Sequence, residues 1–178
     1  MDLTKLPARD REGNVHFVVE SPRGSGLKLK YEAELGVFVL SRTLALGVTY
    51  PFDWGFIPGT LAPDGDPLDA MVITDTPSYP GVVLACAPIG VVRLEQDEKE
   101  GRERNDRVIA VPVKASRFDG IRDHHDLSER MREEIQQFFV AAVFFAGKNV
   151  KLLGWGGREE AMALIDECAR RHAGSRAG

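Results

Sequence analysis

The sequence predicts an α+β fold in which a small barrel or tightly curled sheet is followed by two helices. Short apolar, β-branched runs fill the first two thirds of the chain and are separated by Gly and Pro residues, which is typical of such sheets. The last third instead carries apolar residues at helical spacing. Because no internal repeat or linker interrupts the chain, we expect one domain over residues 1–178.

The first predicted strands cover residues 15–20 and 27–34. In the second of these, apolar residues alternate with charged ones, so Lys30 and Glu32 are expected on the same face of one strand. Further strands are predicted over residues 37–40, 70–75, 82–95, 108–113 and 150–155.

Two amphipathic helices are predicted over residues 128–146 and 158–173. Asp126, with Glu129 three residues later, is expected to form a capping box at the start of the first helix. The segment 95–107 is nearly all charged and lies between two apolar strands. The favoured interpretation is a long solvated hairpin loop; the alternative is that some of its carboxylates turn inward toward a metal site.

Composition excludes several classes of protein. The formal net charge of −4 provides no overall positive field for nucleic acid, and no apolar run approaches the roughly 20 residues of a membrane span. The polar start lacks the apolar stretch of a signal peptide. Cys86 and Cys168 have no CxxC-type neighbour and are predicted to be buried thiols in a reducing compartment. A cytoplasmic location is therefore expected.

The segment Asp64-Gly65-Asp66-Pro67-Leu68-Asp69 places three carboxylates within six residues. Such crowding of negative charge is unfavourable unless a cation lies between the carboxylates. Magnesium is commonly held by a few carboxylates together with substrate phosphate. A calcium EF-hand does not fit, because its Gly and Glu positions are occupied by Asp69 and Asp75. The alternative to a metal site is an Asp-rich surface turn.

The surrounding residues favour phosphate chemistry. Lys30 and Glu32 share a strand face, Arg42 follows, and an aromatic segment over residues 50–61 leads into the Asp-rich turn. Clustered carboxylates with cations at intervals are what phosphoryl transfer requires, because cations hold the phosphates while metals and a carboxylate activate water.

In this order, FVVE (17–20), LKYE (29–32), Arg42, the aromatic segment, DGDPLD (64–69) and VIAVP (108–112) resemble the soluble (family I) inorganic pyrophosphatases. The resemblance runs from about residue 15 to residue 113 and resumes weakly at residues 137–139 and 150–155. It implies a small closed OB-like β-barrel with two C-terminal helices packed outside. It also implies Mg²⁺-dependent hydrolysis of pyrophosphate by metal-activated water, and a homo-oligomer, since similar bacterial proteins commonly form hexamers.

The resemblance also implies roles for individual residues. Asp66 would be the catalytic base or water-orienting carboxylate, and Glu20 would support the interior network. Metal ligands would come from Asp64, Asp66, Asp69 and Glu32. Substrate contacts would come from Lys30, Arg42, Tyr50, Trp54 and Arg107.

The chain departs from the family pattern at several of these positions. Trp54 stands where the family has a Tyr, and Arg107 where it has a Lys. Asn105 replaces a metal-binding Asp; its carbonyl can still coordinate a metal but brings no charge. Asp97, Glu103 and Asp106 are the candidates for supplying the missing carboxylate.

A further departure lies near the end of the first helix. Ala142 and Val143 replace a Tyr-Lys pair that grips a phosphate, and each charge-assisted contact is worth roughly 1.5–3 kcal/mol. Two alternatives to a pyrophosphatase therefore stay open: a related hydrolase of another phosphoanhydride, and a non-catalytic phosphate-binding module. Retention of the Asp triplet favours the pyrophosphatase.

Overall fold

The computed structural model describes residues 2–98, 101–114 and 116–175 of the chain. Its strands are β1 (Val15–Ser21), β2 (Leu27–Glu32), β3 (Val37–Thr43), β4 (Asp53–Ile57), β5 (Leu68–Val72), β6 (Val83–Glu98), β7 (Gly101–Arg104), β8 (Arg107–Pro112) and β9 (Lys151–Gly156). The helices are α1 (Glu129–Ala141) and α2 (Arg158–Ser175), and the short 3₁₀ turns are η1 (Leu3–Lys5), η2 (Ser116–Phe118), η3 (His124–Asp126) and η4 (Phe144–Ala146).

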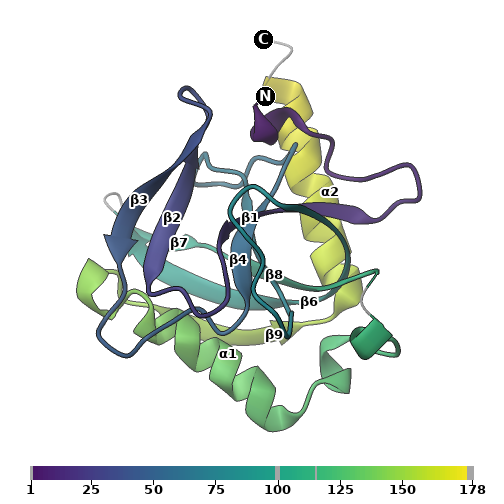
Figure 1. Ribbon diagram of the computed structural model, residues 1–178. Helices are drawn as coiled ribbons and strands as arrows, with labels where there is room; N and C mark the ends of the chain where they lie inside the picture. Colours follow the sequence, from purple (N-terminus) through teal and green to yellow (C-terminus); the bar gives the residue numbers. More distant parts are fainter. Residues whose placement is uncertain (1, 99–100, 115, 176–178) are drawn as a thin grey trace.

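The strands form a closed barrel, as predicted. The sheet runs in the order β1-β4-β5-β8-β6, and β1 pairs again with β6, which closes the ring. The pair β5–β8 is parallel, whereas the other ring pairs are antiparallel. The long strand β6 extends beyond the ring, where it also pairs with β7 and β9. Figure 1 shows this arrangement, with the two-stranded β2–β3 ribbon standing at one side.

Both faces of the barrel strands are buried, because each face packs against a different helix. Ala161, Ile165 and Cys168 of α2 join one core cluster, which includes alternate residues of β5 and β8. Ile135, Phe138 and Phe139 of α1 join the other cluster, which takes the intervening residues of the same strands. The two helices therefore lie outside the barrel on different sides, as Figure 1 shows. Burial on both faces also explains why these strands are continuous apolar runs.

Two strands lie where none was predicted. Residues 53–57 form β4, in which all five residues are buried, so the strand has no polar-apolar alternation that could reveal it. The segment 95–107, interpreted as a solvated loop, consists largely of the end of β6, all of β7 and the first residue of β8. That interpretation was wrong because Gln96 and Arg107 are buried and the segment forms a hairpin ladder. Residues 99 and 100 lie outside the described part.

The predicted first helix is shorter than expected. It ends at Ala141, and Ala142 is its C-cap. Residues 144–146 form the separate turn η4, which is followed by Gly147 at a φ of 68°. The expected capping box is also in a different place: Ser128 caps α1 by accepting from the Met131 amide, while Asp126 pairs with Asp123 in the box that begins η3.

Within the described residues, no helix combines the length and the apolar character that a bilayer crossing needs.

Candidate active site

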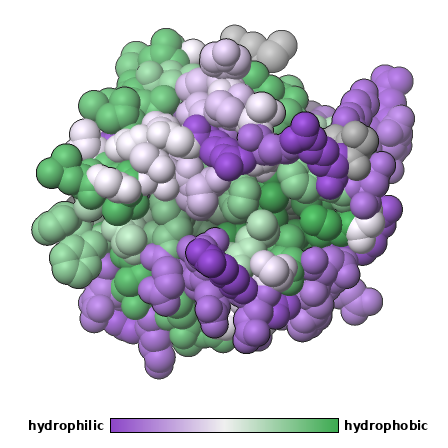
Figure 2. Space-filling view, turned by 60° about the horizontal axis from the view of Figure 1, so that its bottom comes forward, coloured by the Kyte–Doolittle hydropathy of each residue, from purple (hydrophilic) through white to green (hydrophobic). Residues whose placement is uncertain are grey.

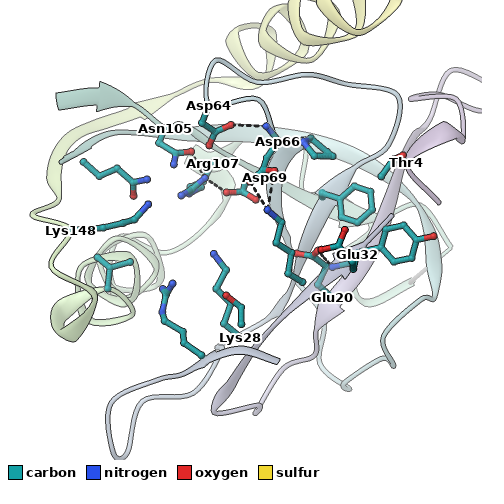
Figure 3. A pocket seen from close by; sticks show the side chains of 18 of the residues that line it. Thr4, Glu20, Lys28, Glu32, Asp64, Asp66, Asp69, Asn105, Arg107 and Lys148 are labelled. Carbon is teal, nitrogen blue, oxygen red and sulfur yellow. Dashed lines mark hydrogen bonds and ion pairs between the residues drawn. The ribbon is translucent and has the colours of Figure 1, made fainter. Parts of the chain in front are cut away.

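One pocket of about 420 Å³ contains most of the residues that the sequence singled out. It opens between the β2–β3 ribbon, the turn before β5, and the start of β8 (Figure 3). Ionisable side chains dominate its wall. They are the acidic residues Glu20, Glu32, Asp64, Asp66 and Asp69, and the basic residues Lys28, Lys30, Arg42, Arg107 and Lys148.

The turn that carries the aspartates is fixed by local hydrogen bonds. Gly65 adopts a φ of 85°, the left-handed conformation that glycine tolerates, and the Asp66 amide donates to Asp64 Oδ1 at 3.2 Å. The buried Thr60 hydroxyl closes the loop, since it accepts from the Leu68 amide at 2.9 Å. This anchoring starts β5 at Leu68 and places Asp69 on the strand, directed toward the pocket.

Two of the three aspartates are paired with cations. Lys30 Nζ lies 2.9 and 2.8 Å from the two carboxylate oxygens of Asp66. Arg107 Nη1 donates to both Asp69 Oδ2 and Asn105 Oδ1. Asp64 has no ion-pair partner among the described residues, and burial, with Asp69 and Asp66 nearby, raises the pKa of its carboxyl group.

A second group of cations lines the opposite part of the pocket. Figure 3 shows Lys28 and Lys148 pointing into the same space as Asp69 and Arg107. Burial, together with the nearby guanidinium groups of Arg107 and Arg42, lowers the pKa of Lys28. Arg42 Nη2 donates to the Ala142 carbonyl at 3.1 Å, which holds this arginine against the end of α1.

Three residues of the pocket wall were missed by the sequence reasoning: Lys28, Gln96 and Lys148. The alternating pattern of residues 27–34 could have revealed Lys28, because it lies two positions before Lys30 on the same face. Gln96 could not have been found, because the segment that contains it was interpreted as a solvated loop. Lys148 follows α1 and carries no local pattern.

An apolar recess of about 40 Å³ adjoins the pocket and shares Lys28, Arg42 and Arg107 with it. Tyr50 and Trp54 line this recess and not the main pocket, with their rings stacked 6.0 Å apart. Ala142 and Val143 lie in its wall, so the two apolar departures are next to the cations. Burial raises the pKa of Tyr50 far above its ordinary value, and its hydroxyl therefore stays protonated.

The remaining predicted residues are placed less centrally. Glu32 lines the pocket, and Figure 3 shows it with Glu20 on the side away from Asp64 and Asn105. Asp97 is not among the lining residues, and Arg102 forms an ion pair with it at 2.9 Å. Asp106 is paired with Arg104 at 2.7 Å. Neither of these carboxylates replaces the one absent at Asn105.

The oxygens of Asp64, Asp69 and Asn105 are the hard donors that Mg²⁺ prefers, and Figure 3 shows them on one side of the pocket. They fit one magnesium ion completed by substrate oxygens. The three aspartates do not converge further. In the described residues, the one group of three acidic, His or Cys ligands within 4.8 Å is Asp123, His124 and His125, which lies elsewhere.

Comparisons with known proteins agree with this geometry. The profile of the inorganic pyrophosphatase family matches residues 17–173. An inorganic pyrophosphatase from Thermus thermophilus is 42% identical, over 97% of this chain and 99% of the relative. One from Synechocystis is 36% identical over the same shares. The crystal structure of inorganic pyrophosphatase from Thermus thermophilus aligns with a TM-score of 0.90 and 39% identity, covering 97% of this chain and 99% of that one. The chain belongs to the inorganic pyrophosphatase family.

Proposed function

We propose that this chain hydrolyses inorganic pyrophosphate to two phosphates with Mg²⁺ as its cofactor. One observation carries the proposal: a single pocket sets Asp64, Asp66 and Asp69 opposite Lys28 and Arg42. Substrate phosphates need the cations, and an attacking water needs a carboxylate. Pyrophosphate is also what the names of the related proteins indicate for those proteins.

The residues divide the work as follows. Lys28, Arg42 and Lys148 contact the phosphates from the side of the ribbon and the end of α1. Asp66 orients and deprotonates the attacking water, and Lys30 holds its carboxylate in place. A bound magnesium ion would neutralise phosphate charge and lower the pKa of water. Asp64, Asp69 and Asn105 are the residues that would hold it.

The test is phosphate release from pyrophosphate in millimolar Mg²⁺, comparing wild type with Asp66→Asn. We expect the variant to lose at least about 10²-fold in rate, because the general base is gone, with an unchanged thermal melt. Asp119→Asn removes one exposed carboxylate outside the pocket and serves as the matched control. Equal activity of Asp66→Asn and wild type would refute the proposal.

A related hydrolase of another phosphoanhydride is the second candidate, because Ala142 and Val143 make an apolar recess beside the cations. A substrate panel of nucleotide and organic diphosphates decides between them. If none is turned over faster than pyrophosphate, this candidate is rejected. Hydrolysis that depends on Asp66 would likewise reject a non-catalytic phosphate-binding module.

A homo-oligomer in the cytoplasm belongs to the same proposal. Phe144, Phe145 and Leu46 are more than two-thirds exposed, and Figure 2 shows apolar side chains gathered along one side of its view. Apolar surface of this kind suits an interface between subunits. Cys86 and Cys168 are both free thiols, as expected in a reducing compartment. Mass photometry at micromolar concentration tests the oligomer, and a monomer would contradict it.

A further inference from the structure

Two aspartates that are candidate metal ligands already have counter-ions supplied by the chain itself. Lys30 reaches both oxygens of Asp66 at 2.9 and 2.8 Å, and Arg107 donates to Asp69 and to Asn105. A lysine and an arginine therefore occupy carboxylate oxygens that a divalent cation would otherwise use. Both pairs form side chain to side chain, without an intervening group.

These counter-ions are built into rigid elements. Arg107 begins β8, which pairs in parallel with β5, so it lies beside Asp69 through the register of the barrel. Its side chain is only 9% exposed, and its guanidinium carbon lies 5.3 Å from the centre of the Trp54 ring. Lys30 lies on β2, which the β3 strand holds through its ladder. The pairing does not depend on a surface loop.

The pocket also contains enough positive charge to receive an anion. Its wall holds the cationic side chains of Lys28, Lys30, Arg42, Arg107 and Lys148, and two of the positions that face them carry neutral amides, Gln96 and Asn105. Within the described residues, nothing accepts a hydrogen bond from the Lys28 ammonium group, although it is largely withdrawn from water. A buried cation in that situation is stabilised by an anionic ligand.

We propose that this pocket binds a diphosphate group without a divalent cation, with Lys30 and Arg107 acting as resident counter-ions in place of metal ions. Lys28 and Arg42 then contact the phosphate oxygens directly. The inference rests on the proposed function only in that the same pocket receives the phosphoanhydride. It requires Lys30 and Arg107 to compete with any metal ion for the oxygens of Asp66 and Asp69, since one set of lone pairs serves both.

Calorimetry with methylenediphosphonate, whose P–C–P link resists hydrolysis, tests the inference. The wild type is titrated once in EDTA and once in millimolar Mg²⁺, at equal ionic strength. We expect binding in EDTA, with a Kd within about tenfold of the value in Mg²⁺, a difference of one order of magnitude in affinity. Binding that appears only with Mg²⁺ overturns the inference and leaves hydrolysis of pyrophosphate standing, because phosphate release decides that separately.

Two variants at one ion pair sharpen the test. Lys30→Gln removes a counter-ion and releases Asp66, so metal-free affinity for the diphosphonate should fall about tenfold, while Mg²⁺ titrated alone should bind more tightly. Asp66→Asn releases Lys30, so metal-free affinity should be kept or increased even though turnover is lost. A residue with a purely structural role would not move the two ligands in opposite directions.

Lys151→Gln is the control for net charge, because Lys151 is exposed on β9 and does not line the pocket. Lys30 is 47% exposed, so its substitution is expected to leave the thermal melt unchanged. If Lys30→Gln and Lys151→Gln weaken metal-free binding equally, general electrostatic attraction explains the binding and the inference is overturned. A weaker Mg²⁺ titration of Lys30→Gln overturns it as well.

Discussion

Arg107 stacks on Trp54: the guanidinium carbon lies 5.3 Å from the centre of the indole ring. The same guanidinium donates to Asp69 and Asn105. Two of the positions at which the chain departs from the family pattern are therefore in contact. The flat indole face suits the planar guanidinium of an arginine, which lysine lacks.

This contact predicts that Trp54→Leu and Trp54→Phe differ in activity. Leu removes the aromatic face, and a cation–π contact is worth about 1–2 kcal/mol when it is desolvated, so kcat/KM for pyrophosphate should fall about tenfold. Phe keeps a ring face, and it removes an indole N–H that has no hydrogen-bond partner in the described residues. Steady-state kinetics of both variants check this. Equal losses for Leu and Phe would show that Arg107 does not depend on the stack.

Glu20 predicts a loss of stability with rising pH. Burial raises the pKa of its carboxyl group from 4.5 to about 7, so the folded protein holds this proton more tightly than the unfolded chain. The free energy of unfolding is therefore highest below about pH 4.5 and falls until about pH 7, by at most about 3 kcal/mol.

Glu20→Gln removes this titration and keeps an oxygen for the Tyr31 amide, which donates to Glu20 at 2.7 Å. Relative to wild type, the variant should gain stability between pH 5 and pH 7, since groups common to both proteins cancel in the difference. Urea unfolding at intervals across this range measures it. Parallel stability curves for the two proteins would contradict the raised pKa.

Gly55 is predicted to tolerate no side chain. A Cβ at this position would lie 1.9 Å from the Val18 carbonyl oxygen, where β4 crosses β1. Because this neighbour is backbone, Gly55→Ala must shift a strand, and we expect a loss of about 3 kcal/mol in the free energy of unfolding. Gly26→Ala is the control, since its nearest listed neighbour is 3.8 Å away. Similar thermal melts for the two variants would show that β4 can move without cost.

Both cysteines are predicted to be inert in the folded protein. Cys86 and Cys168 are 0% and 1% exposed, and burial raises the pKa of Cys168 to about 11 and that of Cys86 further. The thiolate is the reactive form, so neither should react with an aromatic disulfide reagent at pH 8 within an hour. Both should react in concentrated urea. Rapid labelling of the native protein would mean that α2, which covers Cys168, opens readily.

The barrel could be predicted from the sequence where periodicity or continuous apolar runs were present. Residues 27–34 alternate and 108–113 are uniformly apolar, and both segments contain strands. Residues 53–57 also form a strand but include Asp53 and Gly55, which no single-chain pattern assigns to one. Their burial depends on neighbours from distant parts of the chain, and that is a tertiary effect.

The site was predicted only where the motif was local. The Asp-rich turn could be read directly from the sequence, and the structure places it at the pocket. The partner of each aspartate could not be assigned, because Lys30 and Arg107 are brought in by separate strands. The charged segment was misinterpreted for a related reason: charged residues can alternate with buried ones in a hairpin whose other face is covered.

The parallel pairing of β5 with β8 separates the architecture of this protein from its chemistry. Ala70 is opposite Val108, so positions 69 and 107 become neighbours whatever side chains they carry. Exchanging the two, as Asp69→Arg with Arg107→Asp, would invert the polarity of the wall while leaving the backbone ladder intact. In a lineage of such barrels, ligand preference can therefore drift by substitutions at these facing positions, without any rearrangement of the strands.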